Sequence, residues 1–117
     1  MSSMKEEMPN NKSSIAKKIL LLIRQSLRAH MPEGSEAYLY GSRARGDARA
    51  DSDWDVLIVL NKKSLEDSDY ENISYPLTLM GIDYGQEINP IMYTKEKWQQ
   101  SVITPFYHNV MNEGIRI

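Results

Sequence analysis

The sequence predicts an α/β (α+β) domain: a small mixed sheet of about three or four strands flanked by helices. Three observations predict it. The chain has 117 residues, a length that fits one domain. Residues 56–60 form a continuous aliphatic run, typical of a strand buried on both faces. Helical and strand patterns then alternate along the chain. We expect a single domain over residues 15–117, preceded by a flexible N-terminal lead-in over residues 1–14.

The first helix is expected to begin near Ser13 or Ser14, either of which can cap it. Pro32 and Gly34 are expected to end it. Its apolar residues recur at helical spacing and form one face. The residues of this face are Ile15, Ile19, Leu22 and Ile23.

Three strands are expected. Residues 37–40 are short, apolar and aromatic, and they end on Gly41, which favours a strand running into a turn. The run over residues 56–60 is the central strand. Residues 87–93 form the third, and Pro90 indicates that it lies at an edge or contains a bulge.

The remaining helices are marked by caps and prolines. Residues 64–67 resemble a capping box, and a helix is expected to follow, with Pro76 kinking or interrupting it. Thr94 is expected to cap a short helix. Thr104 and Pro105 are expected to begin the last one, with proline at its favoured first position.

Composition excludes several classes of protein. The net charge of −2 does not favour nucleic acid as a partner, since such proteins usually carry a basic excess. No cysteine is present, so disulfides and thiolate metal sites are excluded, in keeping with a cytoplasmic protein. No apolar run is long enough to span a membrane, and the polar first 14 residues are not a secretory signal.

Two carboxylates stand at the start of the most apolar strand. Asp53 and Asp55 are two residues apart, so on a strand they point to the same face, about 7 Å apart along the backbone. Like charges this close are costly unless a positive charge lies between them. A hard divalent cation, most simply Mg²⁺, prefers such oxygen ligands.

A phosphate-binding turn is expected just before these acids. Gly41 permits a tight turn after the first strand, and Ser42 can open a short helix whose hydroxyl and N–H groups bind phosphate oxygens. Arg43 and Arg45 add cationic donors, although Arg43 is as well explained as an ordinary surface residue. Together, the turn and the acids could clamp a metal-bound triphosphate. Trp54 faces away from the acids and is expected to pack in the core.

The spacing resembles that of a known family. A strand ending in Gly-Ser, ten further residues, and Asp-x-Asp on the next strand resemble the DNA polymerase beta-like nucleotidyltransferase superfamily. The wording of residues 41–48, followed by Ser-Asp-x-Asp, is most similar to its minimal nucleotidyltransferase (MNT) branch. Residues 105–115 also resemble the end of such bacterial domains. The resemblance spans nearly the whole chain from Ile15 onward.

The resemblance implies a site and a cofactor. Gly41 and Ser42 would bind the triphosphate, and Asp53 and Asp55 would bind one or two Mg²⁺ ions. The family usually has a third carboxylate on the following core strand, acting as a general base. Glu87 is the nearest candidate for it, and Asp83 is the fallback. Glutamate at this point departs from the family pattern, which usually has aspartate followed by apolar residues.

The resemblance also implies a function and its alternatives. We expect transfer of a nucleoside monophosphate, AMP from ATP, to an acceptor hydroxyl. Minimal nucleotidyltransferases often act as antitoxins that adenylylate a helical HEPN ribonuclease partner. No second substrate domain is expected in this chain, so such a partner would supply the acceptor. The alternative is a catalytically weak or inactive module that binds nucleotide or a partner, or forms a homodimer. An antibiotic-modifying transferase ranks lowest.

Overall fold

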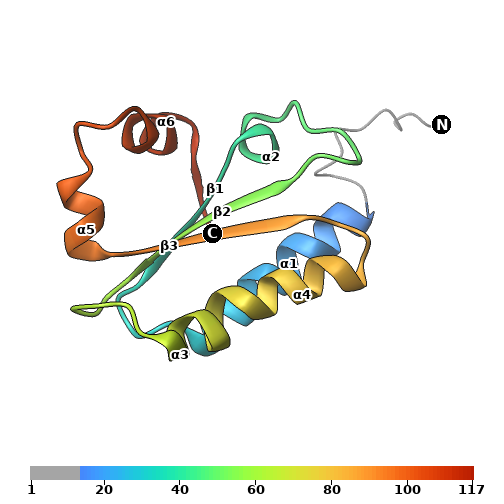
Figure 1. Ribbon diagram of the computed structural model, residues 1–117. Helices are drawn as coiled ribbons and strands as arrows, with labels where there is room; N and C mark the ends of the chain where they lie inside the picture. Colours follow the sequence, from blue (N-terminus) through green and yellow to red (C-terminus); the bar gives the residue numbers. More distant parts are fainter. Residues whose placement is uncertain (1–13) are drawn as a thin grey trace.

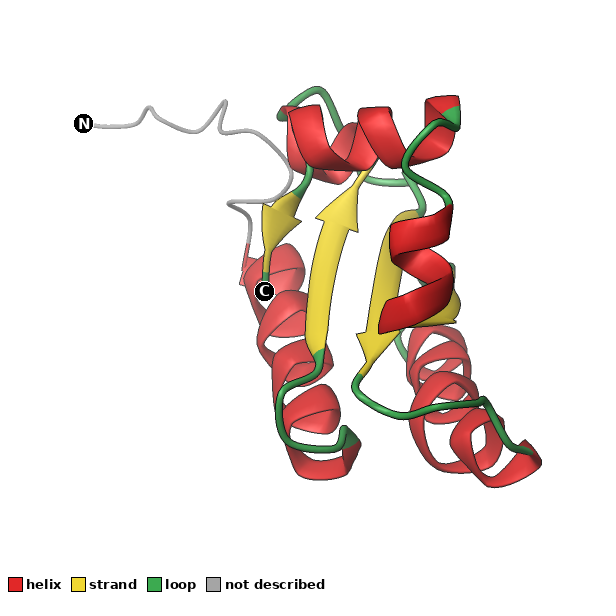
Figure 2. Ribbon diagram, turned by 90° about the vertical axis from the view of Figure 1, so that its left-hand side faces the viewer, coloured by secondary structure: helices red, strands yellow, loops and turns green. Residues whose placement is uncertain are grey.

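One mixed sheet organises the computed structural model, which describes residues 14–117. The strands are β1 (Glu36–Tyr40), β2 (Trp54–Leu60), β3 (Ile88–Thr94) and β4 (Ile115–Arg116). Their order is β3-β2-β1-β4; β1 is antiparallel to β2 and β4, whereas β2 and β3 are parallel. Figure 2 shows β4, beside the C-terminus, alongside β1. The predicted fold class is confirmed.

Helices cover both faces of this sheet. Their bounds are α1 (Ser14–His30), α2 (Ser42–Arg45), α3 (Asp67–Asp69), the π-helical turn η2 (Tyr70–Ser74), α4 (Tyr75–Asp83), α5 (Lys95–Gln100) and α6 (Pro105–Glu113). Figure 1 shows α1 and α4 side by side beneath the sheet, with α2 and α6 on the other side. The predicted lead-in lies outside the described residues, except for Ser14, which begins α1. No helix within residues 14–117 has the length and apolar character that a membrane crossing requires.

The larger core lies between the sheet and α1 and α4. From α1 it takes Ala16, Ile19, Ile23 and Leu27, which follow one another at helical spacing. Of the predicted apolar face, Ile19 and Ile23 are buried, whereas Ile15 is 46% exposed. The face is therefore centred nearer Ala16 and Leu27 than the sequence pattern suggested.

The smaller core lies on the opposite face. Leu57 and Val59 of β2 pack there against Trp98 of α5 and Val110 of α6. Residues 56–60 are thus buried on both faces, as predicted. The side chains of β2 alternate, so Asp55 lies on the same face as Leu57, towards the start of the strand. α5 and α6 pack over the Leu57–Val59 end of this face, and the acidic end faces a solvent-open hollow.

The segment that joins β2 to β3 is helical from Asp67 to Asp83, with a π-helical turn in its middle. Its capping box uses Glu66 and Asp69, two residues beyond the predicted Ser64. Pro76 is at the start of α4, directly after the wide turn. Proline lacks the N–H that an α-helix needs, and the wider turn accommodates this without ending the helix.

The two later helices begin as predicted. The Thr94 side chain accepts a hydrogen bond from the N–H of Lys97 at 3.2 Å. The Thr104 side chain accepts one from the N–H of Tyr107 at 3.2 Å, with Pro105 in the first turn of α6. These caps fix the starts of α5 and α6, whose side chains pack in the smaller core.

Candidate active site

A glycine turn brings β1 into contact with the acidic strand. Gly41 follows β1 with φ of 75°, a left-handed value that favours glycine, and α2 begins at Ser42. A Cβ atom placed on Gly41 would lie 2.5 Å from Oδ2 of Asp55. The absence of a side chain at Gly41 therefore lets the turn approach the Asp55 carboxylate.

The two predicted carboxylates enter the same hollow as this turn. Asp55 pairs with Tyr40 across β1 and β2, and Asp53 precedes β2 on the same face. The hollow has a volume of about 500 Å³ and opens widely to solvent. Its lining residues are Gly41, Ser42, Arg45, Arg49, Asp51, Ser52, Asp53 and Asp55. Five of the residues that the sequence predicted are therefore gathered at one place.

Arg43 does not belong to this lining. Arg43 is only 2% exposed, and its guanidinium lies over the Trp54 ring, 4.3 Å from the ring centroid. Nη2 donates to the carbonyl of Ser52 at 3.0 Å and to that of Ala50 at 3.4 Å. Burial lowers the pKa of Arg43, with the nearby charge of Asp51 opposing the change. The predicted nucleotide contact of Arg43 is thus replaced by a contact with the loop that leads into Asp53.

Trp54 packs in the core, as expected. It is fully buried, and its indole N–H donates to Oε1 of Gln86 at 3.0 Å. Its backbone N–H donates to the carbonyl of Glu87 at 2.8 Å. The residue between the two acids is therefore anchored on one side by Arg43 and on the other by the start of β3.

The two arginines that line the hollow are exposed. Arg45 pairs with Asp47 at 3.3 Å and with Glu113 of α6 at 3.4 Å. Arg49 pairs with Asp51 at 3.9 Å, with both side chains more than four-fifths exposed. Exposed pairs of this kind are weak, so either guanidinium can turn towards an anion at little cost.

The expected third carboxylate is not assembled with the other two. Glu87 is exposed, lies one residue before β3, and lines a neighbouring hollow with Asp53. Asp83 is exposed at the end of α4. Within the described part of the chain, no three His, Cys, Asp or Glu side chains form a group that could hold a metal ion.

Asn89 takes the position beside the acids on β3. It pairs with Asp55 in the parallel register, and its Nδ2 donates to Oδ2 of Asp53 at 3.3 Å. The resemblance implies a carboxylate on this strand, so this amide was not among the predicted site residues. A usable signal was present nonetheless: Asn89 is a polar residue at the start of a strand that runs parallel to β2.

The electrostatics of the hollow favour a cation. Burial raises the pKa of Asp55; the hydrogen bond from Asn89 and the charge of Arg45 lower it, and the charge of Asp53 raises it again. Burial, then the charges of Asp55 and Tyr93, raise the pKa of Tyr40 to about 12. Two carboxylates on one face, next to the Ser42 hydroxyl, form a hard oxygen donor set that fits Mg²⁺.

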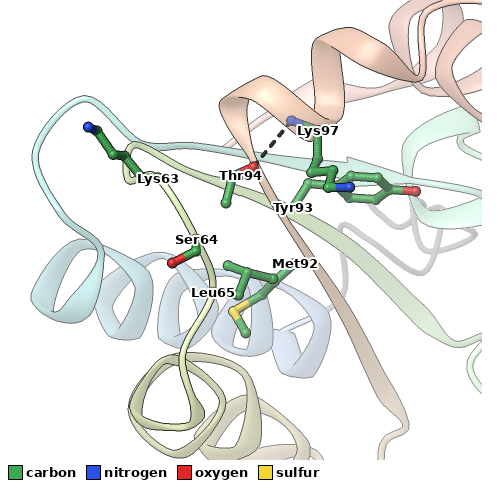
Figure 3. Close-up of a pocket in the computed structure, with 7 residues that line it drawn as sticks. All are labelled: Lys63, Ser64, Leu65, Met92, Tyr93, Thr94 and Lys97. Carbon is green, nitrogen blue, oxygen red and sulfur yellow. Dashed lines mark hydrogen bonds between the residues drawn. The ribbon is translucent and has the colours of Figure 1, made fainter.

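A second hollow lies at the far end of the same strands. It has a volume of about 340 Å³ and lies between the ends of β2 and β3 and the start of α5 (Figure 3). Its lining residues are Lys63, Ser64, Leu65, Met92, Tyr93, Thr94 and Lys97. It contains no carboxylate, and the seven-residue strand β2 separates it from Asp53 by about 20 Å. The second hollow therefore lacks the carboxylates that the predicted chemistry needs.

A small α/β fold with a Gly-Ser turn against paired aspartates defines a nucleotidyltransferase-type domain, and sequence comparison agrees. The model of the family described as "Polymerase beta, Nucleotidyltransferase" matches residues 23–117. The chain belongs to this family. It is also 36% identical over 76 residues to "Putative protein adenylyltransferase MJ0604" of Methanocaldococcus jannaschii, a match that covers 65% of this chain and 70% of that protein.

Proposed function

We propose that this domain is a Mg²⁺-dependent nucleotidyltransferase that moves AMP from ATP to an acceptor hydroxyl. The observation that carries the proposal is the meeting of the Gly41–Ser42 turn with Asp53 and Asp55 in one solvent-open hollow. Phosphate donors and metal ligands are both needed to hold a triphosphate, and each comes from a different strand. Membership of a nucleotidyltransferase family supports the reaction class.

Each residue of the hollow would have its own role in the proposed transfer of AMP. Asp53 and Asp55 would hold the divalent cation, which supplies charge neutralisation at the phosphates when bound. The Ser42 hydroxyl would donate to a phosphate oxygen, and Arg45 would turn from its exposed ion pairs towards the triphosphate. The acceptor oxygen forms a bond to the α-phosphorus, the bond from that phosphorus to the β-phosphate oxygen breaks, and pyrophosphate leaves. The acceptor proton passes to solvent.

We propose a protein as the acceptor. The relative in Methanocaldococcus jannaschii carries the name of a protein adenylyltransferase. An open hollow, rather than a closed pocket, also suits a side chain presented by another protein. The resemblance to minimal nucleotidyltransferases extends this to an antitoxin that adenylylates a HEPN-type helical partner in the bacterial cytoplasm. This partner remains a prediction.

One specific observation favours the alternative of a weak or inactive nucleotide-binding module. The position beside Asp55 on β3 is an amide, Asn89, rather than a carboxylate that could take the acceptor proton. Such a module would keep Mg²⁺-dependent ATP binding and lose transfer, acting through a partner or as a homodimer. Binding and transfer must therefore be measured separately.

Isothermal titration of ATP, with and without Mg²⁺, tests the binding step. We expect Mg²⁺-dependent binding by the wild type and its loss in Asp53→Ala/Asp55→Ala. The control Glu71→Ala/Glu96→Ala removes two exposed carboxylates elsewhere and should bind as the wild type does. A folded wild type that binds no ATP would overturn the proposal. Transfer is then read as the added mass of AMP on this chain or on a co-expressed helical neighbour.

A further inference from the structure

Asn89, on β3, lies beside the two candidate metal ligands. It is the second residue of β3, half-buried, and paired with Asp55 in the parallel register. Its Nδ2 donates to Asp53 Oδ2 at 3.3 Å, so one amide is placed against both members of the acidic pair. Asn89 also lines a separate hollow with Glu87 and Ile82.

An amide at this place changes the charge of the site. With Asn89, the convergent side chains carry two negative charges; with aspartate they would carry three. The affinity of an oxygen site for a divalent cation rises with the number of its carboxylates. The amide N–H also offsets part of the repulsion between Asp53 and Asp55, which otherwise only a cation would offset.

We infer that Asn89 is a positioning residue that holds Asp53 and Asp55 in place without metal and keeps the cation affinity of the empty site low. This inference rests on the proposed function. Its consequence is an order of binding: the cation enters together with the nucleotide, whose phosphates supply the remaining oxygen ligands. Mg²⁺ is commonly held in this way, by one or two carboxylates together with substrate phosphates.

Binding of Mn²⁺, followed by the electron paramagnetic resonance signal of the free ion, tests this order. We expect the wild type to bind Mn²⁺ at least about tenfold more tightly with a non-hydrolysable ATP analogue than without it. Asn89→Asp should bind Mn²⁺ alone at least about tenfold more tightly than the wild type. Asn72→Asp, an exposed asparagine outside the site, is the matched control and should bind as the wild type does. Equal affinity of wild type and Asn89→Asp would overturn the inference.

Thermal unfolding in EDTA gives a second readout. Three convergent carboxylates should lower the Tm of Asn89→Asp, and Mn²⁺ should raise that Tm more than it raises the Tm of the wild type. A variant whose Tm is unchanged by the added charge and unmoved by Mn²⁺ would speak against convergence of the three side chains.

A double-mutant cycle keeps the inference testable if Asn89→Asp fails to fold. Asn89→Ala should lower the Tm of the wild type but have little effect in the Asp53→Ala/Asp55→Ala background, because the contacts with both acids are then already lost. An equal loss in both backgrounds would overturn the positioning role. The cycle uses neither nucleotide nor transfer, so its failure is distinguishable from failure of the proposed function.

Discussion

Gly41 and Asp55 lie so close across β1 and β2 that a Cβ atom on the glycine would be 2.5 Å from Oδ2 of the aspartate. The same glycine has a φ of 75°, which side chains rarely adopt. Two separate physical reasons therefore require glycine at this turn: its backbone conformation and the carboxylate that faces it. The contact links the phosphate-binding turn to a metal ligand.

Replacing Gly41 with alanine should test both reasons at once. We expect Gly41→Ala to lose about 1–3 kcal/mol of unfolding free energy from backbone strain. It should also displace the Asp55 carboxylate and lower Mg²⁺-dependent ATP binding at least about tenfold. Urea denaturation and isothermal titration measure the two effects.

Gly46 provides the matched control. It ends α2 with a φ of 87°, but no atom lies within 4 Å of a Cβ placed there. Gly46→Ala should therefore show the strain, about 1–2 kcal/mol, and keep its ATP affinity. If both alanine variants lose ATP binding equally, contact with Asp55 is not the cause.

Removal of the Arg43 side chain should lower the free energy of unfolding more than removal of an exposed arginine side chain does. Arg43→Ala leaves the carbonyls of Ala50 and Ser52 without their donor and uncovers the Trp54 ring, which should cost about 2 kcal/mol or more. Arg43→Lys should recover only part of this, because an ammonium group cannot both lie flat on the ring and reach two carbonyls.

Arg49→Ala is the comparison for Arg43. Its exposed pair with Asp51 should contribute less than about 0.5 kcal/mol. Denaturation of the three variants in urea gives the ranking. Equal stabilities of Arg43→Ala and Arg49→Ala would show that the buried contacts of Arg43 do not support the loop.

The fold, and the meeting of Gly41 with Asp55 in the candidate site, were predictable from local signals. The aliphatic run of residues 56–60 is typical of a strand buried on both faces, and β2 is that strand. The alternation along it then fixes Asp55 on one face, and Gly41 marks where the previous strand must turn. Each of these inferences needs only residues that are near in sequence.

The misjudged residues depend on contacts between distant segments. Arginine is usually exposed, and nothing near Arg43 in the sequence indicates that α2 turns it onto Trp54, eleven positions later. Glu87 is expected as the third carboxylate because of its residue type, but the register of β3 on β2 places Asn89 opposite Asp55. The strand β4, two residues long, has too little pattern to be recognised.

Asp69 should make part of the stability depend on acid pH. It accepts from Lys62 Nζ at 2.7 Å and from the N–H of Glu66 at 2.8 Å. Although burial acts to raise the pKa of Asp69, these two bonds and the Lys62 charge lower it overall. The stabilisation is thus complete above the unfolded pKa of 3.8 and is lost as pH falls through the lower folded value.

Asp69→Asn is the variant that shows this. At pH 7 it should be less stable than the wild type by about 1 kcal/mol, since the cap and the ion pair are weakened. The difference should shrink as the pH is lowered below 3.8. A difference in unfolding free energy that stays constant down to pH 3 would exclude ionisation of Asp69 as its source.

Asp55 should affect stability in the opposite sense, because its pKa is raised. Burial is the largest cause, and the charge of Asp53 adds to it. The hydrogen bond from Asn89 and the charge of Arg45 act against this rise. As pH rises through 3.8 the unfolded chain loses this proton before the folded one does, so the folded state is progressively destabilised up to its own, higher pKa.

Asp55→Asn removes the ionisation. In EDTA at pH 7 it should therefore have a higher Tm than the wild type, by more than at pH 3.5. Asp51→Asn, whose side chain is 84% exposed, should leave the Tm nearly unchanged. Mg²⁺ together with a non-hydrolysable ATP analogue should raise the Tm of the wild type more than that of Asp55→Asn, because only the wild type keeps both carboxylates to bind the ion. A wild-type Tm that exceeds that of Asp55→Asn in EDTA would mean that the ionised carboxylate stabilises the fold. This result would refute the prediction that ionised Asp55 lowers stability.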